Sequence, residues 1–290
     1  PTGPASHEIL KDKKYLHAEF TPDDITTFLL NDKEKFRVMP LGSLGSNNRL
    51  SAFNIESIEG YHPAKLSIGE KFRQNVVNPE SIFKVMNVKY ILSLNKFSEA
   101  QASELSLKRV KSGKYYNNFK FNDVYVYEYL KFEPRVQFLH KINSVDSRQK
   151  GYDQLNDSKF NIKNNSFIST DDYNQYSNSF AYNLESTVSI KEWSPNRIVL
   201  DVNIFGPKET KHFILLSEIF FPYGWEIENN DIEIMEVNNL IRGFFVSSNN
   251  DEIVLSFRPK DLKYGSIITW SSFIIVLLML VVYRDKNERV

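Results

Sequence analysis

The first part of the chain, residues 1–145, alternates short amphipathic helical patterns with short β-rich runs. Thr21–Asp24 predicts a helix start, because threonine can cap a helix, proline fits the first turn, and acidic side chains favour the positive end of the helix dipole. Ile25, Phe28 and Leu29 then fall on one helical face. Further helices are predicted over residues 64–73 and 79–86, and strands over residues 35–41, 88–92, 124–129 and 135–142. This alternation predicts an α/β domain over residues 1–145.

The sequence that follows changes character twice. Residues 146–185 are polar and predict a connecting region, with one short helix near Asp171–Ser177. From Ser186 the pattern consists of seven short β-rich runs separated by turns such as Ser194–Asn196. Runs at this spacing predict an antiparallel β-sandwich-like domain over residues 186–262. The expected fold class is α+β and multidomain, with an N-terminal α/β domain, a C-terminal β-sandwich and one C-terminal transmembrane helix.

The predicted transmembrane helix covers residues 265–283, GSIITWSSFIIVLLMLVVY, which contain no charged side chain. At about 1.5 Å per residue the segment is roughly 28 Å long, close to one hydrocarbon core. Trp270 and Tyr283 lie toward its ends, where aromatic rings favour the membrane interface. A buried core helix is the alternative, but the charged sequence on both sides favours a membrane span, with residues 284–290 as a cytoplasmic tail. Basic residues flank the span equally, so charge alone does not orient it.

Composition excludes several classes of function. The chain has 36 Lys and Arg residues against 36 Asp and Glu residues, so it lacks the basic excess that nucleic-acid binding requires. It has no cysteine, which excludes disulfides, thiolate zinc sites and a cysteine nucleophile. The five histidines are scattered and form no metal-ligand spacing, so neither a metal nor a cofactor is expected. The carboxylate pairs Asp23–Asp24 and Asp171–Asp172 are interpreted as helix caps and not as catalytic acids.

Residues 37–65 form the first candidate binding segment. A strand, a turn-rich loop and a second break bring cations and amide side chains into a short stretch, which suits phosphate or sugar hydroxyls. The candidate substrate-binding residues are Arg37, Asn48, Tyr61, His62 and Lys65. The alternative is that Gly, Asn and Pro only build turns here and that the charges are solvated.

The second candidate is the aromatic segment Phe220–Trp225, FFPYGW. Tyr223 and Trp225 are candidates for stacking on a glycan or for contact with a membrane surface. The alternative is that these rings cap the core of the predicted sandwich.

Several ordered pieces of the sequence resemble the YfhO-type family of bacterial membrane proteins, which have a polytopic, glycosyltransferase C-like architecture. The resemblance spans about residues 20–283 and rests on these pieces: Phe36–Val38, Asn47–Asn48, Gly60–Lys65, Met86–Leu92, Pro222–Trp225, Asn239, Arg242–Gly243, Phe257–Pro259 and the closing apolar helix. Two departures stand out. Family members usually read Tyr-Pro-Gly-Trp where this chain has Pro-Tyr-Gly-Trp, and the many membrane helices that precede this portion in the family are not in this sequence.

The resemblance implies the extracytoplasmic C-terminal portion of a bacterial cell-membrane protein that transfers a sugar from a polyprenyl-phosphate carrier to a cell-envelope glycan or lipid. Its acidic catalytic residue is expected upstream of Pro1, so no catalytic residue is expected in this chain. Arg37 and Lys65 would contact phosphate, and Asn48, Tyr61 and His62 would contact sugar hydroxyls. The expected partners are the lipid-linked sugar, the glycan acceptor and the bilayer. The alternative is a non-enzymatic, membrane-tethered carbohydrate-binding or scaffold module.

Overall fold

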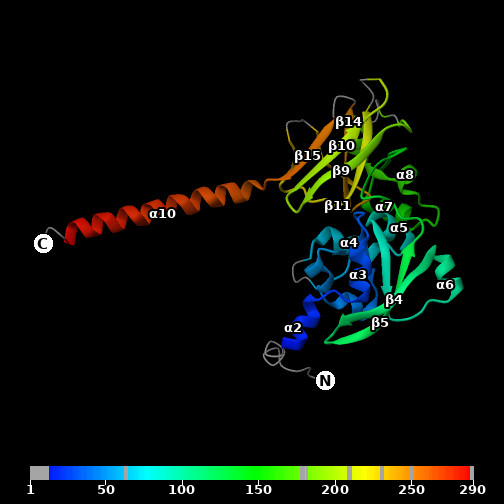
Figure 1. Cartoon of the computed structure of the whole chain (residues 1–290). Coiled ribbons are helices and arrows are strands. Elements are labelled where there is room, and N and C mark those ends of the chain that lie inside the picture. Colours follow the sequence, from blue (N-terminus) through cyan, green and yellow to red (C-terminus); the bar gives the residue numbers. More distant parts are fainter. Residues whose placement is uncertain are drawn as a thin grey trace.

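The computed structural model describes residues 13–61, 65–176, 180, 182–207, 211–228, 232–247 and 251–287, with side chains described from residue 17 to residue 280. Within these residues the fold is mixed α+β, with several sheets that are mostly antiparallel and a long C-terminal helix (Figure 1). One hydrophobic cluster joins buried side chains from residues 58–129, 139–168 and 213–245, and so extends from the lower part of the molecule in Figure 1 into the sheets above it. The predicted fold class is therefore confirmed at the level of its mixed elements and its apolar C-terminal helix.

The first sheet has five strands, in the order β2 (Glu56–Ser57), β1 (Arg37–Pro40), β3 (Val88–Ser93), β5 (Lys120–Tyr129) and β4 (Leu107–Asn117). Strand β1 is parallel to β2 and β3, whereas β5 is antiparallel to both β3 and β4. The helices of this part are α2 (Lys13–Phe20), α3 (Asp24–Asn31), α4 (Ser67–Asn75), α5 (Pro79–Val85) and α6 (Glu99–Glu104). Short 3-10 helices cover Gly42–Ser46 and Arg49–Phe53.

Helix α3 begins as an N-cap motif requires, although the capping residue differs from the prediction. Asp23, and not Thr21, is the N-cap, and its Oδ1 accepts a hydrogen bond from the backbone N–H of Thr26 at 2.9 Å. The other oxygen of Asp23 lies 3.2 Å from Nη1 of the buried Arg49. The helix start is therefore fixed by a cap and an ion pair together.

Two four-stranded antiparallel sheets contain the predicted C-terminal β-rich runs. Their orders are β12–β15–β10–β9 and β13–β14–β11–β6. The bounds are β6 (Val136–Phe138), β9 (Thr187–Ser194), β10 (Arg197–Asn203), β11 (Lys211–Ile219), β12 (Trp225–Ile227), β13 (Met235–Val237), β14 (Ile241–Ser247) and β15 (Glu252–Phe257). A single hydrophobic cluster takes side chains from both sheets, among them Leu200 of β10 and Ile214 of β11, so the sheets share a core.

The prediction that residues 135–142 complete the first sheet is wrong. Strand β6 instead pairs antiparallel with β11, with Phe138 opposite Ile214. Its buried side chains Val136 and Phe138 belong to the core shared by the two four-stranded sheets. The chain therefore enters this core well before the predicted start of the β-rich domain at Ser186.

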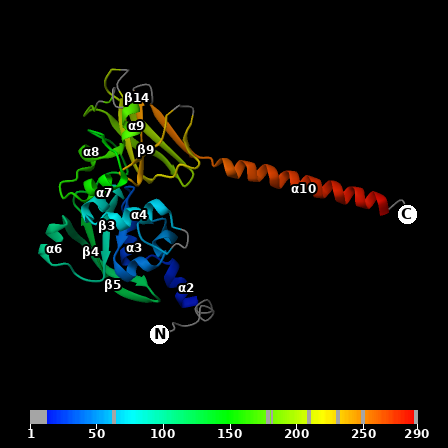
Figure 2. The ribbon, with the colours of Figure 1, turned by 180° about the vertical axis from the view of Figure 1, so that it is seen from behind.

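Residues 146–185 form more than the polar connection that their composition predicts. They contain α7 (Arg148–Asn156), α8 (Ile162–Asn165), β8 (Phe167–Ser169) and α9 (Thr170–Tyr176), and β8 pairs in parallel with β7 (Asn143–Val145). Leu155 and Phe167 are buried in the same hydrophobic cluster as Phe83 of α5 and Phe213 of β11. This segment therefore packs between the first sheet and the two four-stranded sheets, as Figure 2 shows from behind. The predicted short helix near Asp171–Ser177 is confirmed as α9.

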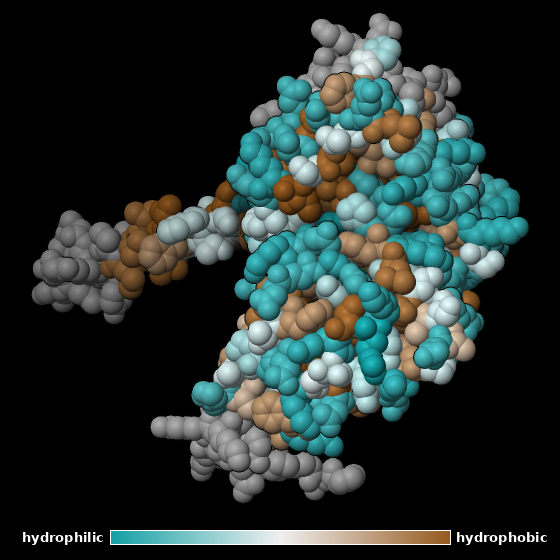
Figure 3. All heavy atoms as spheres, turned by 45° about the vertical axis from the view of Figure 1, so that its right-hand side comes forward, coloured by the Kyte–Doolittle hydropathy of each residue, from teal (hydrophilic) through white to brown (hydrophobic). Residues whose placement is uncertain are grey.

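Helix α10 (Lys260–Asn287) is longer than the predicted span at both ends. Residues 260–280 form a helix long and apolar enough to cross a membrane, and none of it is buried in the rest of the chain. The helix projects away from the globular part, and Figure 3 shows hydrophobic residues along it. Side chains such as Trp270 and Leu278 are more than half exposed. Among the described residues nothing covers this apolar surface, which in a soluble protein would be costly.

Candidate functional site

A groove with two adjoining hollows runs beside β13 and is called the β13 groove here. One hollow, of about 400 Å³, is lined mainly by polar side chains. The other, of about 650 Å³, is lined by aromatic and apolar side chains, one arginine and two glutamates. The two hollows share Phe220, Glu233 and Ile234 as lining residues, so they form one continuous feature with a polar end and an aromatic end.

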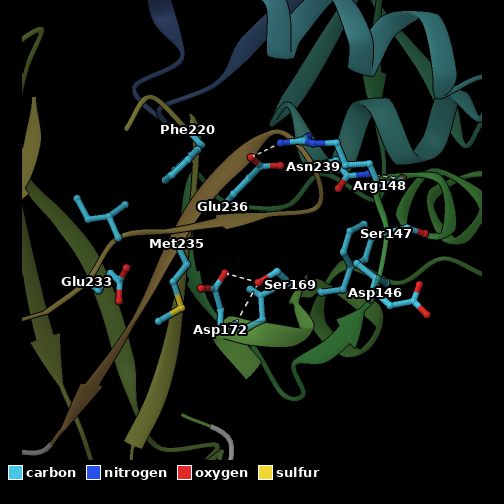
Figure 4. Close-up of a pocket in the computed structure, with 14 residues that line it drawn as sticks. Asp146, Ser147, Arg148, Ser169, Asp172, Phe220, Glu233, Met235, Glu236 and Asn239 are labelled. Carbon is cyan, nitrogen blue, oxygen red and sulfur yellow. Dashed lines mark hydrogen bonds and ion pairs between the residues drawn. The ribbon is translucent and has the colours of Figure 1, made fainter. Parts of the chain in front are cut away.

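The polar end is assembled from three segments that are distant in sequence. Figure 4 shows Arg148 and Glu236 directed toward each other, and Nη2 of Arg148 lies 2.6 Å from Oε2 of Glu236. Asn239 donates a hydrogen bond from Nδ2 to the carbonyl oxygen of Arg148 at 2.8 Å. Ser169 donates from Oγ to Oδ2 of Asp172 at 2.7 Å, at the start of α9. These bonds hold charged and amide groups in fixed positions on the groove wall.

The local sequence explains why these groups meet. Ser147 caps α7 by accepting a hydrogen bond from the backbone N–H of Lys150, which places Arg148 in the first turn. Asn239 has a left-handed backbone, with a φ of 57°. A Cβ on Gly151 would lie 2.6 Å from Nδ2 of Asn239, so glycine is needed at this position for the amide to approach α7. Asparagine tolerates the left-handed conformation better than most residues.

Two charged groups of the polar end, Asp146 and Arg148, have shifted pKa values. The hydrogen bond from Lys150 lowers the pKa of Asp146 below its ordinary value. Burial alone would lower the pKa of Arg148, but the hydrogen bond to Glu236 raises it overall. Ionised carboxylates, amides and hydroxyls are suited to accept from and donate to the hydroxyl groups of a sugar. Among the described residues no group of three His, Cys, Asp or Glu side chains could hold a metal ion.

The aromatic end centres on Trp225 of β12 and Arg242 of β14. The guanidinium carbon of Arg242 lies 4.4 Å from the centroid of the Trp225 ring, within cation–π distance. Trp225 is partly buried and packs against the core of the two four-stranded sheets, as its core-capping interpretation predicts. Phe220 and Phe221 line the same hollow.

The aromatic end lies beside the first residues of α10. Trp225 is paired with Phe257, and the backbone N–H of Arg258 donates to the carbonyl oxygen of Gly224 at 2.6 Å. Gly224 has a φ of 114°, and a Cβ there would lie 3.0 Å from backbone atoms of Pro259. Only glycine fits this close approach without strain. The turn before Trp225 is therefore tied to the chain immediately before the projecting helix.

Arg37 makes its contacts within the fold. Its Nη2 lies 2.6 Å from Oε1 of Glu218, and its Nη1 donates to the carbonyl oxygen of Ser217 at 2.7 Å. Its Nε lies 3.2 Å from Glu56, which also pairs with the buried Arg135 at 2.8 Å. Arg37 thus joins an ion-pair cluster between the first sheet and β11. It begins β1, whereas the candidate loop follows the other end of that strand.

Three other candidates of the first segment, Asn48, Tyr61 and Lys65, do not line the groove. Asn48 accepts from the backbone N–H of Tyr61 at 2.9 Å and donates to its carbonyl oxygen at 2.7 Å, so it closes the loop as a turn device. The Tyr61 side chain is exposed, and Lys65 pairs with Glu70 at 3.4 Å on the surface. His62 lies outside the described residues. The structure therefore brings Asn48 and Tyr61 together, without Arg37.

In the second candidate segment, Trp225 lines the groove, whereas Tyr223 is 72% exposed and does not line either hollow. The sequence interpretation did not select the other groove residues as binding residues: Arg148, Asp172, Glu236, Asn239 and Arg242. A signal was present for one of them, because Arg242 is the single charged residue in the apolar run LIRGFFV. The polar end had no such signal, because its members come from separate segments.

No family model, curated protein or solved structure matches the chain. The resemblance to YfhO-type proteins therefore stays a prediction from motifs.

Proposed function

We propose that this chain is the extracytoplasmic accessory region of a polytopic membrane glycosyltransferase, which transfers a sugar from a polyprenyl-phosphate carrier to a cell-envelope glycan or lipid. In this proposal α10 spans the membrane and the β13 groove holds sugar. The observation that carries the proposal is the position of the groove, whose aromatic end is tied through Gly224 and Trp225 to the root of α10.

The position supports a substrate that is itself bound to the membrane. Residues 260–280 form a 21-residue span, which at about 1.5 Å per residue matches the hydrocarbon thickness of a bilayer. Phe257, the partner of Trp225, lies just before this span. With α10 in the bilayer, the aromatic end faces the lipid headgroups, and the polar end continues from it through Phe220.

The side chains of the groove support a sugar as the occupant. Aromatic rings stack on the apolar faces of sugar rings, and Trp225 and Phe220 supply such surfaces. Carboxylates and amides bind hydroxyl groups, and Asp172 and Asn239 supply them. The proposal includes two finer points of architecture: the facing four-stranded sheets form a β-sandwich domain, and the cluster around Arg135 holds this domain on the α/β domain.

A second candidate is a non-enzymatic, membrane-tethered carbohydrate-binding module. One observation favours it: Glu236 is already paired with Arg148, and Asp172 with Ser169. Carboxylates in such pairs are held for binding and are poorly placed to exchange protons. Both candidates share the sugar-binding groove and differ in whether the chain acts together with a catalytic membrane domain.

The test of the shared step is sugar binding by the full chain in a polyoxyethylene detergent, which contains neither sugar nor phosphate. Saturation-transfer NMR with envelope-type oligosaccharides is expected to show contact in the wild type. Trp225→Leu is expected to weaken binding about fivefold, because one stacking contact contributes roughly 1 kcal/mol. Tyr223→Leu, two positions away and outside the groove, is the matched control. Equal binding by the two variants would refute a sugar site in the groove.

The two candidates are separated in the intact membrane protein. If the chain is an accessory region, Trp225→Leu lowers sugar transfer in membranes and Tyr223→Leu does not. If it is a binding module alone, neither variant changes any transfer reaction, although Trp225→Leu still loses sugar binding.

A further inference from the structure

Arg242 has a feature that the sugar-binding role leaves unexplained. Its side chain is only 3% exposed, yet its Nε and Nη1 have no hydrogen-bond partner among the described residues. Its single hydrogen bond runs from Nη2 to the carbonyl oxygen of Ile219 at 3.0 Å. Buried guanidinium groups are normally paired, because an unpaired buried charge is costly. Arg242 also lines the aromatic end, so its unused N–H groups are candidate donors to a ligand there.

Neighbouring carboxylates do not neutralise Arg242. Glu218 is the carboxylate that acts on it most, but Glu218 is bonded to Arg37 and Arg135. Burial lowers the pKa of Arg242 to about 10; Glu218 opposes this shift and Arg37 adds to it. Arg242 thus remains protonated at neutral pH, and within the described part of the chain no carboxylate forms an ion pair with it.

The lining limits the charge that a ligand can carry. Glu226 and Glu233 also line the aromatic end, and Glu226 lies 3.4 Å from the exposed Arg258. Two carboxylates beside a single unpaired cation disfavour an anion with two or more charges. A phosphodiester carries one negative charge, offers two acceptor oxygens, and bears substituents on both sides. Its polar substituent would fit the polar end, and its apolar substituent would fit the aromatic walls beside α10.

We propose that Arg242 and Trp225 form a binding site for the phosphodiester group of a membrane-lipid headgroup. The inference deepens the proposed function and rests on it for the sugar end of the groove. It places the phosphate at Arg242, beside the sugar ring that Trp225 stacks on and that extends toward the polar end.

The unpaired state of Arg242 gives a second signature. If the site is built for a ligand at a cost in stability, removing the charge should stabilise the empty protein. Arg242→Met has a similar length and suits an apolar site, so it is expected to raise the unfolding midpoint while weakening phosphodiester binding. A variant that only damages the fold would lower both the unfolding midpoint and the affinity for the phosphodiester.

The experiment titrates the full chain, in polyoxyethylene detergent, with three probes followed by ³¹P NMR. They are glycerophosphoglycerol, dihexanoyl phosphatidylglycerol and inorganic phosphate. Saturable binding of either phosphodiester is expected, and Arg242→Met should weaken it by about 10- to 100-fold, as loss of a charge-assisted hydrogen bond does. Arg197→Met, on the exposed end of β10 outside the groove, should bind within twofold of the wild type.

The probes also identify the source of the phosphate. Binding of the dihexanoyl lipid alone supports a lipid headgroup, and equal binding of glycerophosphoglycerol supports recognition of the phosphodiester itself. The inference is overturned if no probe saturates, if inorganic phosphate binds more tightly than both phosphodiesters, or if Arg242→Met binds like the wild type. Arg242→Lys keeps a cation but not the guanidinium, so it should recover only part of the binding.

The outcome is separable from that of the sugar test. Phosphodiester binding that depends on Arg242, together with no oligosaccharide binding, would refute the sugar-binding function and retain this site. Oligosaccharide binding without phosphodiester binding would refute the Arg242 site and retain the sugar-binding function.

Discussion

Arg135 donates from Nη1 to Oε1 of Glu218, and the two atoms lie 2.5 Å apart although the residues are separated by 83 positions. Arg135 is 1% exposed and precedes β6, whereas Glu218 lies on β11. Glu56 of β2 binds the opposite side of Arg135 at 2.8 Å. The ring of Trp193 lies 5.4 Å from its guanidinium carbon. One buried arginine thereby joins the first sheet to the two four-stranded sheets.

Glu218→Gln is expected to destabilise the protein by about 3 kcal/mol, because it leaves Arg37 and Arg135 with one carboxylate between them in a buried site. Urea unfolding of the full chain in detergent measures the change. Glu192→Gln is the matched control, since Glu192 pairs with Arg197 on the surface. An exposed pair contributes less than about 1 kcal/mol. Equal effects of the two substitutions would contradict a stabilising role for the cluster.

Ionisation of Glu56 is expected to make the free energy of unfolding depend on pH in the acidic range. Burial would raise its pKa, but Arg135, Arg37 and Lys35 lower it from 4.5 to about 2. Because the folded-state pKa is depressed, the ionised form contributes stability that is complete above pH 4.5 and is lost as the pH falls toward 2. The contribution is about 3 kcal/mol.

Unfolding free energies measured between pH 6 and pH 2.5 check this prediction. The wild type should lose stability steeply below pH 4.5, and Glu56→Gln should be less stable at neutral pH and show a shallower slope. If the free energies of unfolding of the wild type and Glu56→Gln fall in parallel, other carboxylates cause the loss of stability at low pH.

Titration of His212 is expected to make the free energy of unfolding depend on pH a second time, near neutrality. It lies on β11, is 1% exposed, and neither ring nitrogen has a hydrogen-bond partner among the described residues. Burial lowers its pKa below the ordinary value of 6.5. The unfolded chain therefore binds the proton first, and stability falls as the pH drops below 6.5.

His212→Leu removes both unpaired nitrogens and the titration. It is expected to gain about 1 kcal/mol at pH 7.5, as relief of an unsatisfied buried group does, and to gain more at pH 5.5. Thermal unfolding at the two pH values gives the difference. A gain that is the same at both values would exclude titration of His212 as the cause.

The hydrophobic pattern of the sequence predicted those elements whose own side chains are strongly apolar. The β-rich runs after Ser186 correctly predicted strands such as β10, and the apolar run over residues 265–283 correctly predicted the apolar part of α10. Strand β4 was not predicted, because its sequence LKRVKSGKYYN is largely polar and half of it is exposed. A strand of this kind is defined by its pairing with β5 and not by its own hydrophobicity.

The missed functional features depend on contacts across the fold. Arg37 bonds to Glu218, which lies 181 positions away and is invisible to a local pattern. Arg148 and Asn239 also meet through a hydrogen bond spanning 91 positions. The one cue available in sequence was Arg242, a charged residue within an apolar strand, since such a residue requires a partner or a ligand.

Helix α10 supplies the last prediction, on membrane insertion. Leu277 lies within the apolar span, and its side chain is 46% exposed. Leu277→Arg places a charge within the hydrocarbon region and is expected to cost about 2.5–3.5 kcal/mol of insertion free energy. Ser266→Arg lies near the start of the span, where an arginine side chain can extend to the headgroups, and is the control. Carbonate extraction of membranes should release Leu277→Arg and retain both the wild type and Ser266→Arg. Retention of all three would show that α10 is not the anchor, and it would remove the reason for placing the aromatic end of the β13 groove at a membrane surface.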